Sequence, residues 1–142
     1  MLPIPMRWLI HGNISPAAVQ AIVRHGHVTT GVSELLVDED LALSDLLKHA
    51  LQKQLDVITT DRSLVDSASE SKRKFGRAIV YLQLAGGDVE QDDAIDRLFA
   101  RYKSPKPGML YTVTENRVKI RQLPGGTLPA PGKAAAEAPA DD

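Results

Sequence analysis

The chain has 142 residues, a formal net charge of -1 and no cysteine. Hydrophobic residues make up 43% of the sequence and charged residues 25%, which is typical of one globular domain and not of a disordered chain. The small net charge excludes a protein that attracts polyanions over its whole surface, so any contact with nucleic acid requires a local patch. Without cysteine the chain forms neither disulfides nor thiolate metal sites.

The first residues do not resemble a secretory signal. No basic segment precedes the apolar run, and Pro3 and Pro5 interrupt it. No window of the sequence reaches the roughly 20 apolar residues of a membrane helix. We therefore expect a cytoplasmic protein that does not contact a membrane.

Four short segments rich in apolar and β-branched residues predict buried strands, and helical segments separate them. The predicted strands cover residues 7–11, 27–32, 56–60 and 78–82. Helices are predicted from Ser15-Pro16 to Gly26, over the apolar stripe of 43–51, more weakly over 62–74, and after Asp88, with Gln91 placed for a capping box. Strands that alternate with helices predict an α/β fold with a mainly parallel sheet and helices on both faces.

The C-terminal third of the sequence changes character twice. Segments 109–114 and 117–123 alternate apolar and polar residues around Glu115-Asn116, which predicts a β-hairpin at the sheet edge. From Pro124 onward Gly, Pro and Ala dominate, which predicts a disordered tail over 124–142. The sequence therefore predicts one domain over residues 1–123.

Polar residues follow the predicted strands, at the edge where a parallel sheet binds ligands. His11, Gly12 and Asn13 close the first strand, and Asp61 follows the third. Asp45 lies near the start of the second helix, outside its apolar stripe. Carboxylates that converge at one edge repel each other unless a cation neutralises them, and their oxygen atoms suit Mg²⁺ or Mn²⁺.

Each of these residues also has a purely structural interpretation. Asp61 alternatively caps the following helix, and Asn13 alternatively makes an Asx-type turn. Asp45 alternatively is a solvated helix residue or an i,i+4 partner of His49. His11 alternatively is a half-buried histidine whose hydrogen bonds are satisfied. The sequence leaves these alternatives open.

Three longer segments follow one another in a recognisable order: LIHGNISPAAVQAIVRHGHVTTGVSEL, SDLLKHALQKQLDVITTDRSL and MLYTVTENRVKIRQLP. They resemble, in turn, three parts of the small PIN-like proteins related to VapC-type toxins. These parts are an opening strand that ends in Asp-Glu-Asn, an acidic helix with a strand closing in Thr-x-Asp, and a closing hairpin. The resemblance covers about residues 6–124.

The resemblance implies a metal-dependent ribonuclease, in which Mg²⁺ or Mn²⁺ activates a water molecule against a phosphodiester. By position it implies Asp45 and Asp61 as catalytic residues and metal ligands, and Asn13 and Arg62 as contacts to the substrate. It further implies a component of a toxin–antitoxin pair, with RNA, an antitoxin-like protein and a second copy of the chain as partners.

The sequence departs from the family at His11 and Gly12, which stand where the family has its aspartate and glutamate. Histidine ligates a metal only when neutral, and it adds no negative charge. Two hypotheses follow. In the first, the chain is a ribonuclease with an altered site that binds Mn²⁺ weakly through Asp45 and Asp61. In the second, it is a catalytically inactive PIN-like domain that binds RNA or a protein partner. A phosphoreceiver domain is disfavoured, because it needs an acidic pair after the first strand.

Overall fold

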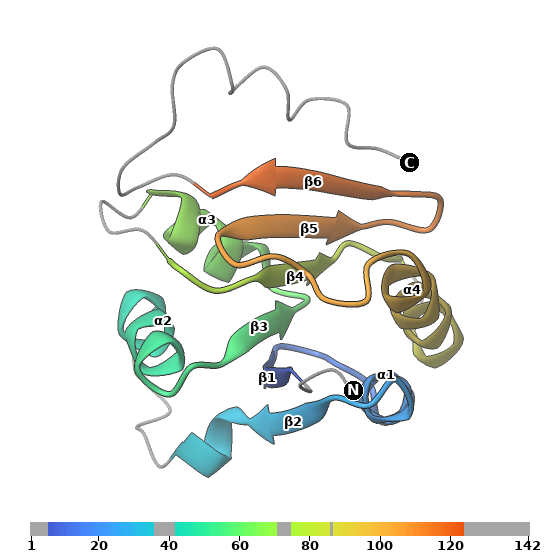
Figure 1. Cartoon of the computed structure of the whole chain (residues 1–142), viewed down its shortest axis with the longest axis horizontal. Helices are drawn as coiled ribbons and strands as arrows, with labels where there is room; N and C mark the ends of the chain where they lie inside the picture. Colours follow the sequence, from blue (N-terminus) through green and yellow to red (C-terminus); the bar gives the residue numbers. More distant parts are fainter. Residues whose placement is uncertain (1–5, 36–41, 71–74, 86, 124–142) are drawn as a thin grey trace.

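Six strands and four α-helices make up the described part of the chain, and the strands form one sheet (Figure 1). The structure is a computed structural model that describes residues 6–35, 42–70, 75–85 and 87–123. The strands are β1 (Arg7–His11), β2 (Val28–Gly31), β3 (Asp56–Thr59), β4 (Ile79–Leu82), β5 (Met109–Val113) and β6 (Val118–Gln122). The helices are α1 (Pro16–Arg24), α2 (Leu43–Gln52), α3 (Arg62–Glu70) and α4 (Asp88–Arg101), and a short 3-10 helix, η1 (Val32–Leu35), follows β2.

The sheet has the strand order β2-β1-β3-β4-β5-β6. The neighbouring pairs from β2 to β5 are parallel, and β6 lies antiparallel to β5 at one edge. The prediction of an α/β fold with a mainly parallel sheet is therefore confirmed. The chain passes from β1 to β2 on one side and then to β3 on the other, so the strand order reverses between β1 and β3. Parallel sheets bind ligands at such a reversal, outside the carboxyl ends of the strands.

Two helices cover each face of the sheet, with α1 and α4 on one side and α2 and α3 on the other (Figure 1). Side chains alternate between the two faces along a strand. In β1, Trp8 therefore packs in the core under α1 and α4, while Leu9 packs in the core under α2 and α3. In β3, Ile58 and Val57 divide in the same way. The central strands are apolar on both faces because both faces are buried.

The ends of α1 and α4 show how the sequence sets local structure. Ser15 caps α1 as predicted, because its Oγ accepts the N–H of Ala18 at 3.1 Å. The predicted cap of α4 is wrong, since Asp88 is already the first helical residue and Gly87 precedes it. Glu90, and not Gln91, accepts the N–H of Gly87, at 2.9 Å. Gln91 is instead buried and makes contacts outside its own helix.

Other predictions differ from the structure in their boundaries. The strand predicted over 27–32 is shorter in the structure, because β2 covers only Val28–Gly31 and Val32 begins η1. The weak helix predicted over 62–74 forms as α3 over Arg62–Glu70, and residues 71–74 lie outside the described residues. The tail predicted over 124–142 also lies outside them. In the described ranges, no helix has the length and the apolar character to cross a bilayer.

Candidate functional site

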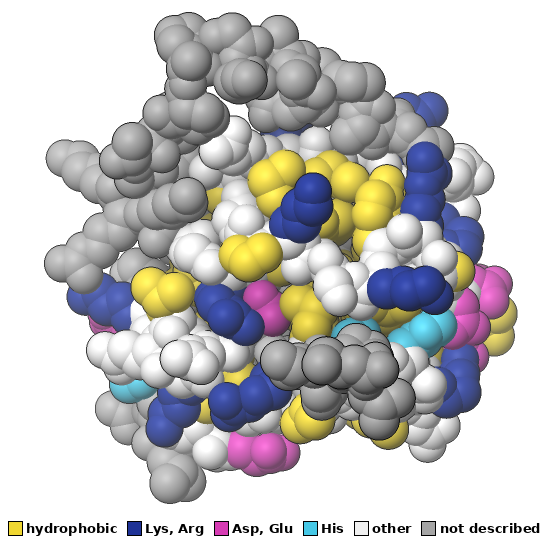
Figure 2. Space-filling model, viewed as in Figure 1, with side chains coloured by type: hydrophobic (Ala, Val, Ile, Leu, Met, Phe, Trp, Pro, Cys, Tyr) yellow, Lys and Arg dark blue, Asp and Glu magenta, His cyan; other side chains and the backbone are white. Residues whose placement is uncertain are grey.

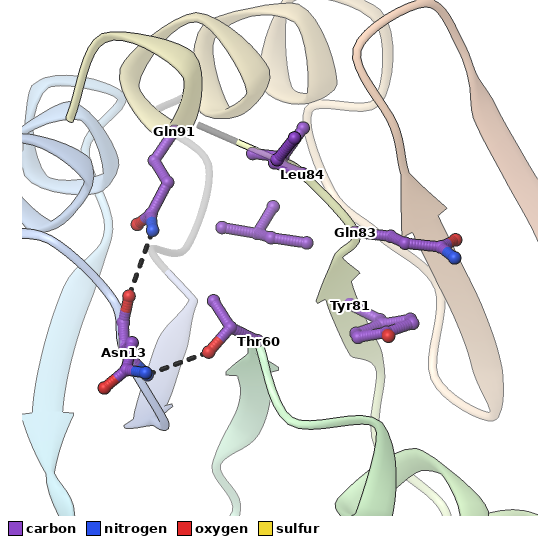
Figure 3. Close-up of a pocket in the computed structure, with 8 residues that line it drawn as sticks. Asn13, Thr60, Tyr81, Gln83, Leu84 and Gln91 are labelled. Carbon is purple, nitrogen blue, oxygen red and sulfur yellow. Dashed lines mark hydrogen bonds between the residues drawn. The ribbon is translucent and has the colours of Figure 1, made fainter. Parts of the chain in front are cut away.

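The loop after β1 is fastened to two other elements at the reversal of the strand order (Figure 3). The N–H of Asn13 donates to Thr60 Oγ1 at 2.8 Å, which ties the loop to the end of β3. From α4, Gln91 Nε2 donates to the carbonyl of Asn13 at 3.0 Å, and its Oε1 accepts the N–H of Ser15 at 2.8 Å. The Gln91 amide thus satisfies two backbone groups that form no part of a helix or a strand.

A cavity of about 520 Å³ lies beside this loop, outside the ends of β1, β3 and β4. Three amide side chains, a threonine hydroxyl, a tyrosine ring and aliphatic groups line the cavity, and none of the lining residues carries a charge. They are Asn13, Thr60, Tyr81, Leu82, Gln83, Leu84, Ala85 and Gln91. Asn13 and Gln83 are exposed, so their side chains are accessible to a ligand. The cavity therefore offers neutral hydrogen-bonding groups beside an apolar surface.

The ring of His11 contacts the buried hydroxyl of Thr59 across the sheet. Thr59 is fully buried, and its Oγ1 accepts the N–H of Asp61 at 2.9 Å and lies 2.8 Å from His11 Nδ1. Which of these two atoms donates the proton depends on the tautomer of the His11 ring. Burial lowers the pKa of His11 and outweighs the opposing charge of Asp61.

Gly12 adopts a backbone conformation that favours glycine. Its φ is +82°, in the left-handed region, and a Cβ atom added there would lie 2.7 Å from Thr60 Oγ1. A glutamate at this position would therefore require both the loop and Thr60 to move. The loop after β1 therefore favours glycine at this position, and a change to glutamate would not be a simple exchange of side chains.

Asp61 is the cap of α3. Its Oδ1 accepts the N–H of Ser63 at 2.8 Å, in the first turn of the helix, which confirms the capping interpretation. The carboxylate still lies close enough to His11 to act on the pKa of that residue. Capping occupies one of its oxygen atoms, so Asp61 is at most a partly available ligand.

Asp45 and Arg62 do not line the cavity. Asp45 lies in the first turn of α2, and its Oδ1 is 3.7 Å from Lys48 Nζ, so its ionic partner is Lys48 and not His49. Arg62 Nε lies 3.8 Å from Asp66 Oδ1 one turn along α3, and the Arg62 side chain is 76% exposed. Of the residues predicted for the site, Asn13 lines the cavity, while His11 and Asp61 lie near each other at the ends of β1 and β3 and are not part of its lining.

These residues do not fit a site for a divalent cation. His11 brings no negative charge and its Nδ1 contacts Thr59, Gly12 carries no ligand, and Asp61 caps a helix. In the part of the chain that the structure describes, no group of three or more His, Cys, Asp and Glu residues could hold a metal. We therefore derive no chemical step through a metal ion.

Several residues of the cavity and its surroundings, namely Gln91, Thr60 and Thr59, were not predicted from the sequence. Gln91 shares helical spacing with Ile95 and Leu98, which are buried, so its place on the buried face of α4 was a usable signal. Thr59 and Thr60 were recognised only as β-branched strand residues. Their hydroxyls become important through contacts across the sheet, which a single sequence does not reveal.

Comparisons of this chain with models of known families, with curated proteins and with solved structures gave no match.

Proposed function

We propose that the chain is a PIN-like domain that binds single-stranded RNA in the cavity outside β1, β3 and β4 without hydrolysing it. The observation that carries this proposal is the hydrogen bond between Thr59 and His11, 2.8 Å long. It holds an imidazole, whose pKa burial lowers, where the resemblance places a catalytic carboxylate. A neutral imidazole does not repel phosphate, whereas a nuclease of this type needs carboxylates that attract a cation.

The lining of the cavity supports a nucleobase as the ligand. Single-stranded RNA is recognised by hydrogen bonds to the edges of unstacked bases and by stacking on aromatic rings. Asn13 and Gln83 supply amides that both donate and accept, Thr60 supplies a hydroxyl, and Tyr81 supplies a ring. A cavity of about 520 Å³ is within the usual range of roughly 300–1,000 Å³ for small-ligand sites and is large enough for one nucleotide.

The ribonuclease alternative keeps one observation in its favour. Asp61 acts electrostatically on His11, so a carboxylate at position 11 would face a second carboxylate across β1 and β3. A toxin–antitoxin role would add an antitoxin-like protein as a partner, and a homodimer is the further possibility that the resemblance implies. The binding proposal and the nuclease alternative differ in their need for a metal.

Fluorescence anisotropy with a labelled, random-sequence RNA of about ten nucleotides tests the proposal. We expect binding in the presence of EDTA, with the RNA recovered at full length on a denaturing gel. Asn13→Ala and Gln83→Ala should each weaken binding about five-fold, since one lost hydrogen bond costs about 1 kcal/mol. Gln52→Ala, which removes an exposed amide from α2, is the matched control and should bind as the native protein does. Binding that requires Mn²⁺, or no binding to RNA at all, would refute the proposal.

A further inference from the structure

A second groove lies on the α3 side of the sheet, where β5 and β6 continue beyond the helix. It has a volume of about 300 Å³. One wall is the surface of α3, and the floor consists of side chains from three neighbouring strands. Its residues are Arg62, Val65, Asp66 and Ser69 from the helix, and Tyr81, Gln83, Leu110, Thr112, Lys119 and Arg121 from the strands and their ends.

The floor of this groove follows from the register of the sheet. Tyr81 pairs with Thr112, and Thr112 pairs with Lys119, so these three side chains form one row across β4, β5 and β6. Arg121 lies two residues after Lys119, and residues two apart on a strand point to the same face. Both cationic side chains are exposed. The row therefore leads from an aromatic ring at the centre of the sheet to two cations at its edge.

The groove continues from the cavity. Tyr81 and Gln83 line both of them. In Figure 3, the Gln83 side chain extends away from Asn13 and Gln91, toward the strands at the edge of the sheet. A chain molecule bound in the cavity would thus pass over Tyr81 and Gln83 into the groove.

The two cations of β6 have no anionic partner among the described residues, whereas cations such as Arg24 and Arg77 do. On the face shown in Figure 2, Lys and Arg side chains are dispersed among hydrophobic and acidic ones and do not merge into a basic surface. Arg24, for example, lies 2.9 Å from Asp92 and 3.1 Å from Asp96. Within the described residues, Lys119 and Arg121 form no ion pair. Two like charges on one face of a strand repel each other, and a bound anion would relieve that repulsion.

We propose that this groove holds the sugar–phosphate backbone of the RNA strand whose base occupies the cavity, with Lys119 and Arg121 each contacting a phosphate. The inference rests on the proposed function and adds a direction to it: the strand leaves the cavity over Tyr81 and Gln83 and crosses β5 and β6. Phosphate contacts of this kind supply affinity and position, while the neutral cavity discriminates between bases.

Cations on an edge strand also have a purely protective role. Lys and Arg at a sheet edge prevent the strand from pairing with another chain. That role would be independent of RNA, so the two interpretations predict different salt dependences of binding. A merely protective pair would leave RNA affinity unchanged when it is removed and would increase self-association instead.

The decisive variant is the double substitution Lys119→Ala/Arg121→Ala, compared with Lys53→Ala/Lys103→Ala. Lys53 and Lys103 are exposed and lie outside both the cavity and the groove, so the control loses the same charge elsewhere. The probe is the ten-nucleotide RNA, titrated by anisotropy between 50 and 300 mM KCl. Each phosphate contact to a single strand contributes about 0.7 to the slope of log affinity against log salt. We expect the groove variant to lose about 1.4 from this slope and the control to keep the native slope.

The outcomes separate the groove from the cavity. If Asn13→Ala weakens binding while the groove variant keeps the native affinity and slope, the cavity proposal stands and the groove proposal is overturned. If the groove variant loses slope and Asn13→Ala binds normally, the phosphate contacts of Lys119 and Arg121 stand, but the base in the cavity and the path proposed from it into the groove are both overturned. If the native protein does not bind RNA, both fail. An equal loss of slope in the Lys53/Lys103 control would also overturn the groove proposal, because the effect would then come from total charge.

Discussion

The ring of His11 and the hydroxyl of Thr59 form a cross-strand pair, with 2.8 Å between Nδ1 and Oγ1. The two residues are register partners in the parallel pair of β1 and β3, so the contact is fixed by the sheet itself. Because Thr59 also accepts the N–H of Asp61, one hydroxyl links the end of β1 to the start of α3. The histidine is therefore part of the framework of the site, and its neutral state is a structural property of the fold.

The protein should lose stability as the pH falls through about 6.5. Burial lowers the pKa of both His11 and His27, and the charge of His25 adds to the effect at His27. The unfolded chain takes up these protons near pH 6.5, and the folded protein takes them up only at lower pH. The free energy of unfolding is therefore highest above pH 6.5 and decreases below it. It levels off once the two histidines are protonated in both the folded and the unfolded protein.

Urea denaturation between pH 8 and 5.5 measures this loss. The His11→Gln variant should show a smaller decrease than the native protein, because one of the two neutral histidines is gone. The matched control is His49→Gln on α2, which keeps both and should follow the native curve. The hydrogen bond from His25 lowers the pKa of Asp96 below its ordinary value of 3.8. The contribution of Asp96 to stability is therefore lost only below the pH range of this experiment. A native stability that does not change between pH 8 and 5.5 would contradict the neutral state of His11.

Gly12→Ala should destabilise the protein more than Gly26→Ala does. Both glycines have a positive φ, +82° and +87°, so each substitution carries a backbone cost of about 1–2 kcal/mol. Around Gly26 a new Cβ meets no atom within 4 Å, whereas at Gly12 it meets Thr60 Oγ1 at 2.7 Å. We expect an additional cost of about 1–3 kcal/mol at Gly12. Urea denaturation with Thr60→Ala as the second substitution tests the cause, since that background should remove the additional cost. The same cost in both backgrounds would show that Thr60 is not responsible.

His11→Asp should create a binding site for Mn²⁺ that the native protein does not have. The new carboxylate would face Asp61 across the ends of β1 and β3, and a cation relieves the repulsion between two carboxylates. Calorimetry should detect Mn²⁺ binding to His11→Asp and its loss in His11→Asp/Asp61→Asn. Native protein, Asp45→Asn and Asp61→Asn should give identical isotherms. If native protein binds Mn²⁺ and Asp61→Asn does not, the altered nuclease is the better hypothesis.

The sequence predicts the order of strands and helices well, because most elements are set by local patterns. The run of apolar residues in β1 and the Ser15-Pro16 start of α1 are examples, and both agree with the structure. The site was predicted less completely. Asp61 precedes a helix in the sequence, so it fits both a metal ligand and a cap, and the contact to Ser63 shows that it acts as the cap. The contact between His11 and Thr59 spans 48 positions of the chain and depends on the register of two strands, which the sequence pattern does not specify.

Gln91→Glu should keep one of the two hydrogen bonds that hold the loop after β1 and break the other. In the native protein, Oε1 accepts the N–H of Ser15 and Nε2 donates to the carbonyl of Asn13. An ionised glutamate keeps the first bond and places a second acceptor against the Asn13 carbonyl. The buried position also disfavours the charge, so the pKa of the new carboxyl should be raised. We expect a loss of about 2–4 kcal/mol at pH 7, in line with a buried polar group facing the wrong partner.

The dependence on pH identifies the cause of that loss. A protonated glutamic acid donates to the Asn13 carbonyl, so the deficit relative to native protein should shrink as the pH falls from 8 to 5.5. Gln91→Met, which fills a similar volume without polar atoms, is the matched control and should show a deficit that does not change with pH. Urea denaturation of the three proteins in parallel removes the contribution of the histidines, because all three share it. If the deficits of Gln91→Glu and Gln91→Met change equally with pH, the Asn13 carbonyl is not the partner that matters. The same loop carries Asn13, which lines the cavity proposed to bind RNA. Both variants should therefore also bind the ten-nucleotide RNA more weakly at pH 7, and Gln91→Glu should recover affinity as the pH falls.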